Sequence, residues 1–149
     1  MNNLYGLDTN VLVYASFKKF PQHTLAARLI KLITENKIHA AVAWQNLTEY
    51  CAVVTNNKNI AQPLSFKEAW QQLSGLLQLG VKVVFPNNTT FAQTETLIKH
   101  KPAIKCQQVH DLFLAATFLS NGVKTIITHN KADFTDIKEL TVLSTADVI

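Results

Sequence analysis

Residues 4–15 read LYGLDTNVLVYA, and one acid, Asp8, stands between two apolar runs. The run before Asp8 predicts a short buried strand over residues 5–7. The run after it predicts a turn of helix, for which Thr9 is a suitable N-cap. An acid at the end of a buried strand has no routine structural task, because an unpartnered buried carboxylate costs several kcal/mol. Asp8 is therefore the first candidate functional residue.

Segments of strand and helix character alternate along the rest of the chain. A loop is predicted over 100–106, and further strands over 38–43, 81–85, 124–128 and 140–143. Helices, one of them capped by Ser65 and ended by Gly80, are predicted over 22–36, 46–55, 66–79, 89–99 and 109–119. This alternation predicts an α/β protein, a three-layer α/β/α fold whose central, mainly parallel sheet has about five strands. In such sheets ligands bind beyond the carboxyl ends of strands, where the winding direction reverses.

Length and composition suit one domain over residues 1–149. The chain has 149 residues, of which 48% are hydrophobic, and no second compositional block interrupts it. Cys51 and Cys106 are far apart and form no C-x-x-C pair, so neither a disulfide framework nor a zinc site is predicted. No basic start with an apolar h-region and no long apolar run is present. We therefore expect a soluble, cytoplasmic protein that binds no membrane.

The charge balance favours a polyanionic partner. Fourteen basic residues face ten acids, which gives a net charge of +4. A solubilising surface would give the same small excess. The lysines that we predict to contact a nucleic-acid backbone, with solvated side chains as the alternative, are Lys18, Lys19, Lys99, Lys101 and Lys105.

Four acids share one kind of position, at strand ends or helix starts: Asp8, Glu49, Asp111 and Asp133. The apolar neighbours of Glu49 predict a largely covered helix, although Asp111 could merely complement a helix dipole and Asp133 could cap a turn. No Lys or Arg lies within three residues of Asp8 or Glu49. A divalent cation would satisfy all four acids, and ligation by oxygen alone selects hard ions such as Mg²⁺ or Mn²⁺.

Four stretches in order, LDTNVLVYA, NLTEY, VHDLFLAAT and THNKADF, resemble the four motifs of the PIN-domain nucleases. The resemblance runs from residue 4 to about residue 145 and is closest to the VapC-type toxins of toxin-antitoxin pairs. It implies a PIN-like α/β fold and a Mg²⁺- or Mn²⁺-dependent endoribonuclease that cuts RNA. It also implies a homodimer held inactive by a cognate antitoxin protein.

The same resemblance assigns roles to individual residues. Matched motif by motif, the metal-binding and catalytic acids are Asp8, Glu49, Asp111 and Asp133. The polar residues that would support them are Thr9, Asn10, Thr128 and Asn130. Many relatives carry a further acid before the last Asp-Phe pair, where this chain has Asn130 and Lys131. The fourth metal ligand is thus the position most affected by this departure.

Two alternatives to the toxin remain open at this point. A PIN-like module with weakened catalysis would bind RNA or a protein, and a housekeeping PIN nuclease would process RNA without an antitoxin. The region of Trp44, Phe66 and Trp70 either packs in the core, which the spacing favours, or forms a groove for an antitoxin segment.

Overall fold

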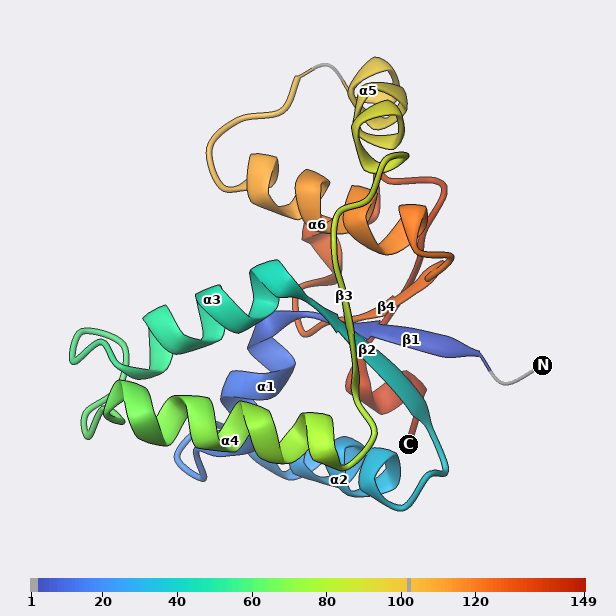
Figure 1. The fold of residues 1–149 in the computed structure, drawn as a ribbon. Coiled ribbons are helices and arrows are strands. Elements are labelled where there is room, and N and C mark those ends of the chain that lie inside the picture. Colours follow the sequence, from blue (N-terminus) through green and yellow to red (C-terminus); the bar gives the residue numbers. More distant parts are fainter. Residues whose placement is uncertain (1–2, 102) are drawn as a thin grey trace.

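A computed structural model describes residues 3–101 and 103–149 of the chain (Figure 1). The described residues form five strands: β1 (Leu4–Leu7), β2 (His39–Ala43), β3 (Lys82–Val84), β4 (Thr125–Ile127) and β5 (Thr141–Leu143). They also form six α-helices: α1 (Thr9–Ser16), α2 (His23–Thr34), α3 (Trp44–Val54), α4 (Phe66–Gln78), α5 (Thr90–His100) and α6 (Gln108–Ser120). Two short 3-10 turns complete the described structure: η1 (Lys131–Asp133) and η2 (Thr145–Asp147).

The five strands make one sheet in the order β3-β2-β1-β4-β5, and every neighbouring pair is parallel. The predicted mainly parallel sheet is thus confirmed. The chain winds outward from β1 through β2 to β3 and then returns to add β4 and β5 on the other side. The winding direction therefore reverses at β1, and a crevice is expected beyond its carboxyl end, beside β2 and β4.

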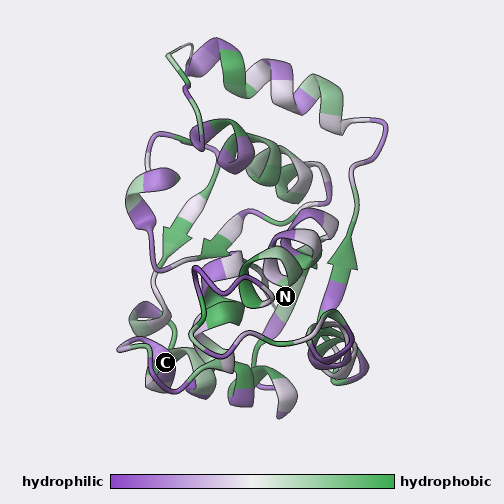
Figure 2. Cartoon of the chain, turned by 90° about the vertical axis from the view of Figure 1, so that its left-hand side faces the viewer, coloured by the Kyte–Doolittle hydropathy of each residue, from purple (hydrophilic) through white to green (hydrophobic). Residues whose placement is uncertain are grey.

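Helices cover both faces of the sheet, which gives the three layers that the alternation predicts. Alternate residues of β2 belong to two separate cores, with Val42 in one core and Ala41 in the other. In Figure 1, α5 and α6 lie above the sheet while α1, α2 and α4 lie below it. Figure 2 shows the strand arrows mostly in green, as expected for strands buried on both faces.

Close packing at the centre of the sheet depends on a glycine in β1. A Cβ atom at Gly6 would lie 2.9 Å from ring atoms of Phe118, which is fully buried on α6. Only glycine lets the ring approach the strand this closely. The distance fixes how far α6, and with it the first turn of that helix, stands from the carboxyl end of β1.

The predicted helix α4 has the expected ends. The Ser65 hydroxyl accepts a hydrogen bond from the N–H of Glu68, whose carboxylate accepts from the N–H of Ser65 in return, so a capping box starts the helix. Gly80 follows the helix with a φ of 102°, a left-handed conformation that favours glycine. The predicted loop over 100–106 is found on both sides of residue 102, which lies outside the described residues, although His100 still belongs to α5.

The prediction that Trp44, Phe66 and Trp70 pack in the core is wrong. Their exposed fractions are 45%, 66% and 43%. Val109 and Phe113 on α6 are likewise 38% and 49% exposed. Helical spacing places apolar residues on one side of a helix, but it does not say whether a neighbouring element covers that side.

Across residues 3–101 and 103–149, no helix combines the length and the apolar content that crossing a bilayer requires.

Candidate active site

Asp8 lies between β1 and α1 and forms hydrogen bonds that extend the strand and cap the helix. Its N–H donates a 3.0 Å hydrogen bond to the carbonyl of Ile127, which continues the β1–β4 ladder by one residue. Its carboxylate oxygen Oδ1 accepts a 2.7 Å hydrogen bond from the N–H of Thr9. Asp8 is therefore the N-cap of α1, and the prediction of Thr9 as N-cap is wrong by one residue. An aspartate in extended backbone just before a helix caps it as well as threonine does.

Sheet register explains why Asp8 meets Thr128. Leu7 pairs with Ile127 in the β1–β4 ladder, so the next residues of the two strands lie side by side. The buried hydroxyl of Thr128 donates to Asp8 Oδ2 over 2.7 Å, and the Asn10 amide donates to the same oxygen over 3.0 Å. Asp8 thus accepts three hydrogen bonds, and since a carboxylate has about four acceptor positions, Oδ1 keeps one that is free.

Asn10 and Asn130 support this arrangement in different ways. The Asn10 oxygen Oδ1 accepts from the N–H of His129 over 3.2 Å, so its amide group is held from two sides. Asn130 contributes its backbone instead, because its N–H donates to the Thr128 hydroxyl over 2.9 Å while its side chain is exposed. The sequence pattern could not separate a side-chain contribution from a backbone one.

Glu49 is less covered than the sequence predicts. Its helix α3, predicted to be largely covered, buries one face with Leu47 and Tyr50, but Glu49 itself lies on the exposed side. The carboxylate is nevertheless held, because the hydroxyl of Thr9 donates to Glu49 Oε2 over 3.0 Å. The same Thr9 therefore binds Asp8 through its backbone and Glu49 through its side chain.

All four predicted acids line one cleft of about 620 Å³ at the carboxyl edge of the sheet. Asp111 comes from the first turn of α6 and Asp133 from η1, and both are half-buried. Neither of these two carboxylates accepts a hydrogen bond from another described residue, so both are free to turn within the cleft. The structure thus brings together side chains that are up to 125 residues apart in the sequence (Asp8 and Asp133).

The cleft is short of positive charge. Burial raises the pKa of Asp8 to about 6 despite the hydrogen bonds from Thr128 and Thr9, and the charges of Glu49 and Asp133 add to the rise. Burial also raises the pKa of Asp111 to about 6, with further contributions from the neighbouring carboxylates. Lys58 is the only Lys or Arg among the described residues that line the cleft. A site with this excess of carboxylates attracts cations.

The donor set fits a hard divalent ion in its chemistry, because it consists of carboxylate oxygens. Within residues 3–101 and 103–149, however, no three acid, His or Cys side chains converge closely enough to hold an ion as they stand. Asp8 is locked by its hydrogen bonds, whereas Asp111 and Asp133 are not. Binding an ion would therefore require these two acids to turn toward Asp8, whose Oδ1 retains a free acceptor position.

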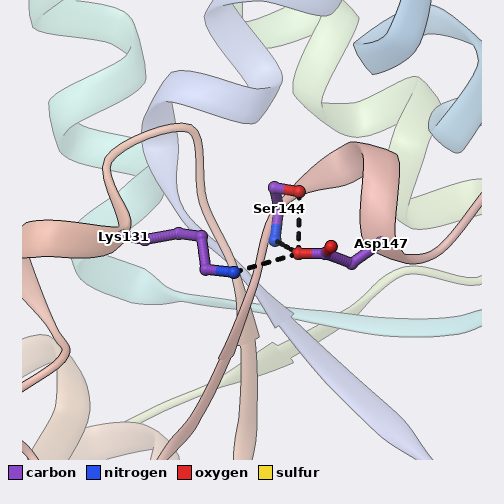
Figure 3. Close-up of polar contacts among 3 residues, drawn as sticks. All are labelled: Lys131, Ser144 and Asp147. Carbon is purple, nitrogen blue, oxygen red and sulfur yellow. Dashed lines mark hydrogen bonds and ion pairs between the residues drawn. The ribbon is translucent and has the colours of Figure 1, made fainter.

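Lys131, two residues before Asp133, binds an acid outside the cleft. Its ammonium group donates to Asp147 Oδ2 over 3.1 Å, and Ser144 binds the same oxygen through its N–H and its hydroxyl (Figure 3). These contacts lower the pKa of Asp147 to about 2. Lys131 does not line the cleft. It ties η1, which carries Asp133, to η2.

None of the five lysines predicted to contact RNA lines the cleft. Lys18, Lys19, Lys99 and Lys105 are exposed, while Lys101 forms a 3.3 Å ion pair with Asp136. Their role in RNA binding stays a prediction.

The sequence reasoning missed Lys58 and two aromatic residues of the cleft wall, Tyr14 and Phe20, whose ring centroids are 5.0 Å apart. Lys58 lies in the polar run TNNKN directly after α3, and that position behind a candidate acid's helix is the signal that could have found it. It also missed Asn46, a buried polar residue one helical turn before Glu49.

The all-parallel sheet with its reversal at β1, together with four carboxylates beyond the strand ends, defines an α/β protein with an acidic crevice. A family model described as PIN domain matches residues 6–132, and the chain belongs to the PIN domain family.

Among individual proteins, the chain is similar to Ribonuclease VapC24 of Mycobacterium tuberculosis. The two are 25% identical over 133 residues, which cover 89% of this chain and 90% of the relative. The fold is shared with VapBC2 from Rickettsia felis, solved bound to a DNA fragment from its promoter (TM-score 0.67, 20% identity, 95% and 98% of the two chains). It is also shared with DNA-bound VapBC from Salmonella typhimurium (TM-score 0.69, 16% identity, 97% and 99% of the two chains).

Proposed function

We propose that this protein is a metal-dependent endoribonuclease of the VapC type and the toxin component of a toxin-antitoxin pair. The observation that carries the proposal is the convergence of Asp8, Glu49, Asp111 and Asp133 on one cleft. The similarity to a relative named as a ribonuclease supports RNA as the substrate. The net charge of +4, with acids gathered in the cleft, supports a polyanionic substrate bound by the surrounding surface.

The four carboxylates are the groups that would hold Mg²⁺ or Mn²⁺. The chemistry that such an ion would supply there is a water molecule of lowered pKa and polarisation of a phosphodiester. Asp8 supplies a fixed reference point, because three hydrogen bonds hold it at the end of β1. Asp111 and Asp133 supply carboxylates that can turn toward the ion. Lys58, which also lines the cleft, is placed to contact a phosphate of the RNA.

The four acids of the cleft favour a catalytic protein over a module that only binds RNA or a protein. The absence of an acid at positions 130 and 131 was the argument for weakened catalysis, and it loses force because Lys131 is bound to Asp147 and does not enter the cleft. A cationic side chain at this position therefore does not compete for the carboxylates. The housekeeping alternative differs only in lacking an antitoxin and is tested by partner binding.

Two protein partners belong to the proposal. Solved relatives are VapBC complexes, which supports a cognate antitoxin here. We also propose a homodimer through the α5–α6 surface, defined as the exposed side chains Trp44, Phe85, Phe91, Ile98 and Phe113. Two of these rings, Trp44 and Phe85, stack with centroids 5.6 Å apart. An exposed apolar surface of this kind favours association with a second copy.

The test of the nuclease is cleavage of a cellular RNA pool by the purified protein with Mg²⁺, with Mn²⁺ and with EDTA. We expect discrete cuts that need the ion and that Asp8→Asn abolishes, since the amide loses the charge of the ligand. Glu95→Gln is the matched control, because Glu95 is an exposed acid outside the cleft. A folded wild-type protein that makes no more cuts than Asp8→Asn with either ion would overturn the proposal.

The test of the partners uses molar mass in solution. The wild-type protein should elute as a dimer, and Phe91→Ser, which changes the most exposed aromatic side chain of the α5–α6 surface, should elute as a monomer. Co-expression with the product of the adjacent reading frame should give a stable complex that suppresses cleavage. A nuclease that binds no such product would be a housekeeping enzyme.

A further inference from the structure

Asn46 is a fully buried polar side chain at the third position of α3. Its oxygen Oδ1 accepts a 2.8 Å hydrogen bond from the N–H of Ala43, and its amino group Nδ2 donates to the hydroxyl of Thr9 over 3.1 Å. It touches no substrate-facing surface, because it does not line the cleft. Its only polar contacts among the described residues are thus a backbone group and Thr9.

The chemistry of these groups fixes the direction of the whole chain of hydrogen bonds. A backbone N–H can only donate, so the Asn46 oxygen must face Ala43 and its amino group must face Thr9. The Thr9 hydroxyl then accepts from Asn46, and its single proton is left to donate to Glu49 Oε2, 3.0 Å away. The chain of hydrogen bonds therefore has one direction, from the backbone N–H of Ala43 at the end of β2 to the carboxylate of Glu49 in the cleft.

We propose that Asn46 is a positioning residue, which orients the Thr9 hydroxyl so that Glu49 is held with Oε2 bound and Oε1 free for a divalent cation. This inference rests on the proposed metal-dependent function. Glu49 needs such a restraint more than the other acids do, because it is exposed and has three side-chain torsions to order. Without the restraint, ordering this side chain would subtract from the affinity for the ion.

The decisive variant is Asn46→Asp, measured at pH 8.5 so that the buried carboxyl group is ionised, since its protonated form would still donate to Thr9. The ionised form keeps the shape of the side chain and an oxygen for Ala43 but replaces the donor to Thr9 by an acceptor. The Thr9 proton is then drawn to position 46 and away from Glu49. Added negative charge alone would strengthen cation binding, whereas the proposal predicts the opposite sign. We expect the affinity of the metal-free full-length protein for Mn²⁺, measured by titration calorimetry, to fall about 10-fold, as for other groups that orient a ligand.

A double-mutant cycle separates this role from a general structural one. Thr9→Val removes the hydroxyl and should lower the affinity for Mn²⁺ by a similar factor, and Thr9→Ser should recover most of that loss. In the Thr9→Val background, Asn46→Asp should cause no further loss, because its route to Glu49 is already broken. The matched control is Thr48→Val, since the Thr48 hydroxyl on the same helix donates to the Gln45 carbonyl and, among the described residues, to nothing in the cleft.

The outcomes discriminate between the inference and the function on which it rests. An Asn46→Asp protein that binds Mn²⁺ within twofold of the wild type, or losses that add across the cycle, would overturn the role of Asn46 and leave the nuclease intact. A wild-type protein that binds no Mn²⁺ would overturn the metal site and this inference together. Thermal melting of each metal-free variant monitors the fold. If the acid prevents folding, Asn46→Leu, which also lacks the donor, carries the same prediction.

Discussion

The hydroxyl of Thr128 donates a 2.7 Å hydrogen bond to Oδ2 of Asp8, which joins the carboxyl ends of β4 and β1 through two side chains. Thr128→Val keeps the shape of this fully buried residue and removes this bond, together with the bonds that the hydroxyl accepts from the Asn10 amide and the Asn130 N–H. We expect the free energy of unfolding at pH 7.5 to fall by about 2 kcal/mol, the usual value for a hydrogen bond to a charged group. Urea denaturation measures this loss.

The same variant has a pH signature. Because the hydrogen bond from Thr128 lowers the pKa of Asp8, the loss in Thr128→Val should shrink at pH 4.5, where Asp8 is protonated. Thr128→Ser, which keeps the hydroxyl, should retain most of the stability at both values. An equal loss at pH 4.5 and pH 7.5 would show that packing, not the bond to Asp8, accounts for the effect.

The metal-free protein should lose stability as the pH rises from about 4 to about 6. The pKa of Asp8 and that of Asp111 are raised to about 6 in the folded state, while an unfolded aspartate titrates near a pKa of about 3.9. In this window these two carboxyl groups bind more protons in the folded protein than in the unfolded chain, so they make the free energy of unfolding fall with increasing pH. His129, whose pKa burial lowers, contributes with the opposite sign toward the upper end of the window. Urea denaturation from pH 4 to pH 7.5 measures the slope.

Asp111→Asn should flatten that slope, since the amide cannot ionise, and Glu95→Gln, which changes an exposed acid outside the cleft, should leave the slope unchanged. With saturating Mn²⁺, the free energy of unfolding should instead rise with pH above pH 6, because the ion binds only the ionised acids of the folded state. A wild-type protein whose stability rises steadily from pH 4 to pH 6 without metal would contradict the raised pKa values.

Gly6→Ala should destabilise the protein by about 1–3 kcal/mol, the usual cost of overpacking a core. The new methyl group would stand 2.9 Å from the ring of Phe118, which is fully buried and cannot move aside. Phe118→Leu alone leaves a cavity, but the smaller side chain makes room for the added methyl group. The double variant should therefore lose less stability than the sum of the single variants, and simple additivity would rule out the clash.

Lys58→Ala should weaken RNA binding in a salt-dependent way. Binding of a labelled fragment of a cleaved RNA is measured by fluorescence anisotropy in the Asp8→Asn background, which prevents cutting. If Lys58 contacts one phosphate, the slope of log K against log salt should decrease by about 0.7. Lys124→Ala is the matched control, because this exposed lysine precedes β4 at the opposite edge of the sheet. Equal slopes for the two variants would exclude the contact.

The strand order could not be read from the sequence, yet the position of the acids could. Parallel strands place their carboxyl ends at one edge, so an acid after β1 and polar residues after β4 were expected to meet there. In the structure, Leu7 pairs with Ile127, and this register places Asp8 beside Thr128 at a hydrogen-bond distance of 2.7 Å. The cap at Ser65 was also predicted correctly, because it depends on neighbouring residues alone, whereas the cap of α1 was misplaced by one residue, from Asp8 to Thr9.

The wrong predictions concern what covers a side chain. Glu49 shares a helix with buried residues but lies on its open side, and Trp44 and Phe66 remain exposed on helices whose other faces are packed. Which face is covered depends on elements distant in sequence, and periodicity carries no information about them. Lys58 was missed for the same reason, since the loop after α3 reaches the cleft only in the folded chain.

The order of the site residues along the chain also governs when the site can exist. β1 supplies Asp8 within the first residues made, but its partner strand β4 and Asp133 come after residue 124. Synthesis proceeds from the amino end at about 5–20 residues per second, and the central strand stays without one of its neighbours until β4 has left the ribosome. A nascent chain therefore cannot assemble the crevice before β4 and Asp133 have been made, however early Asp8 is in place.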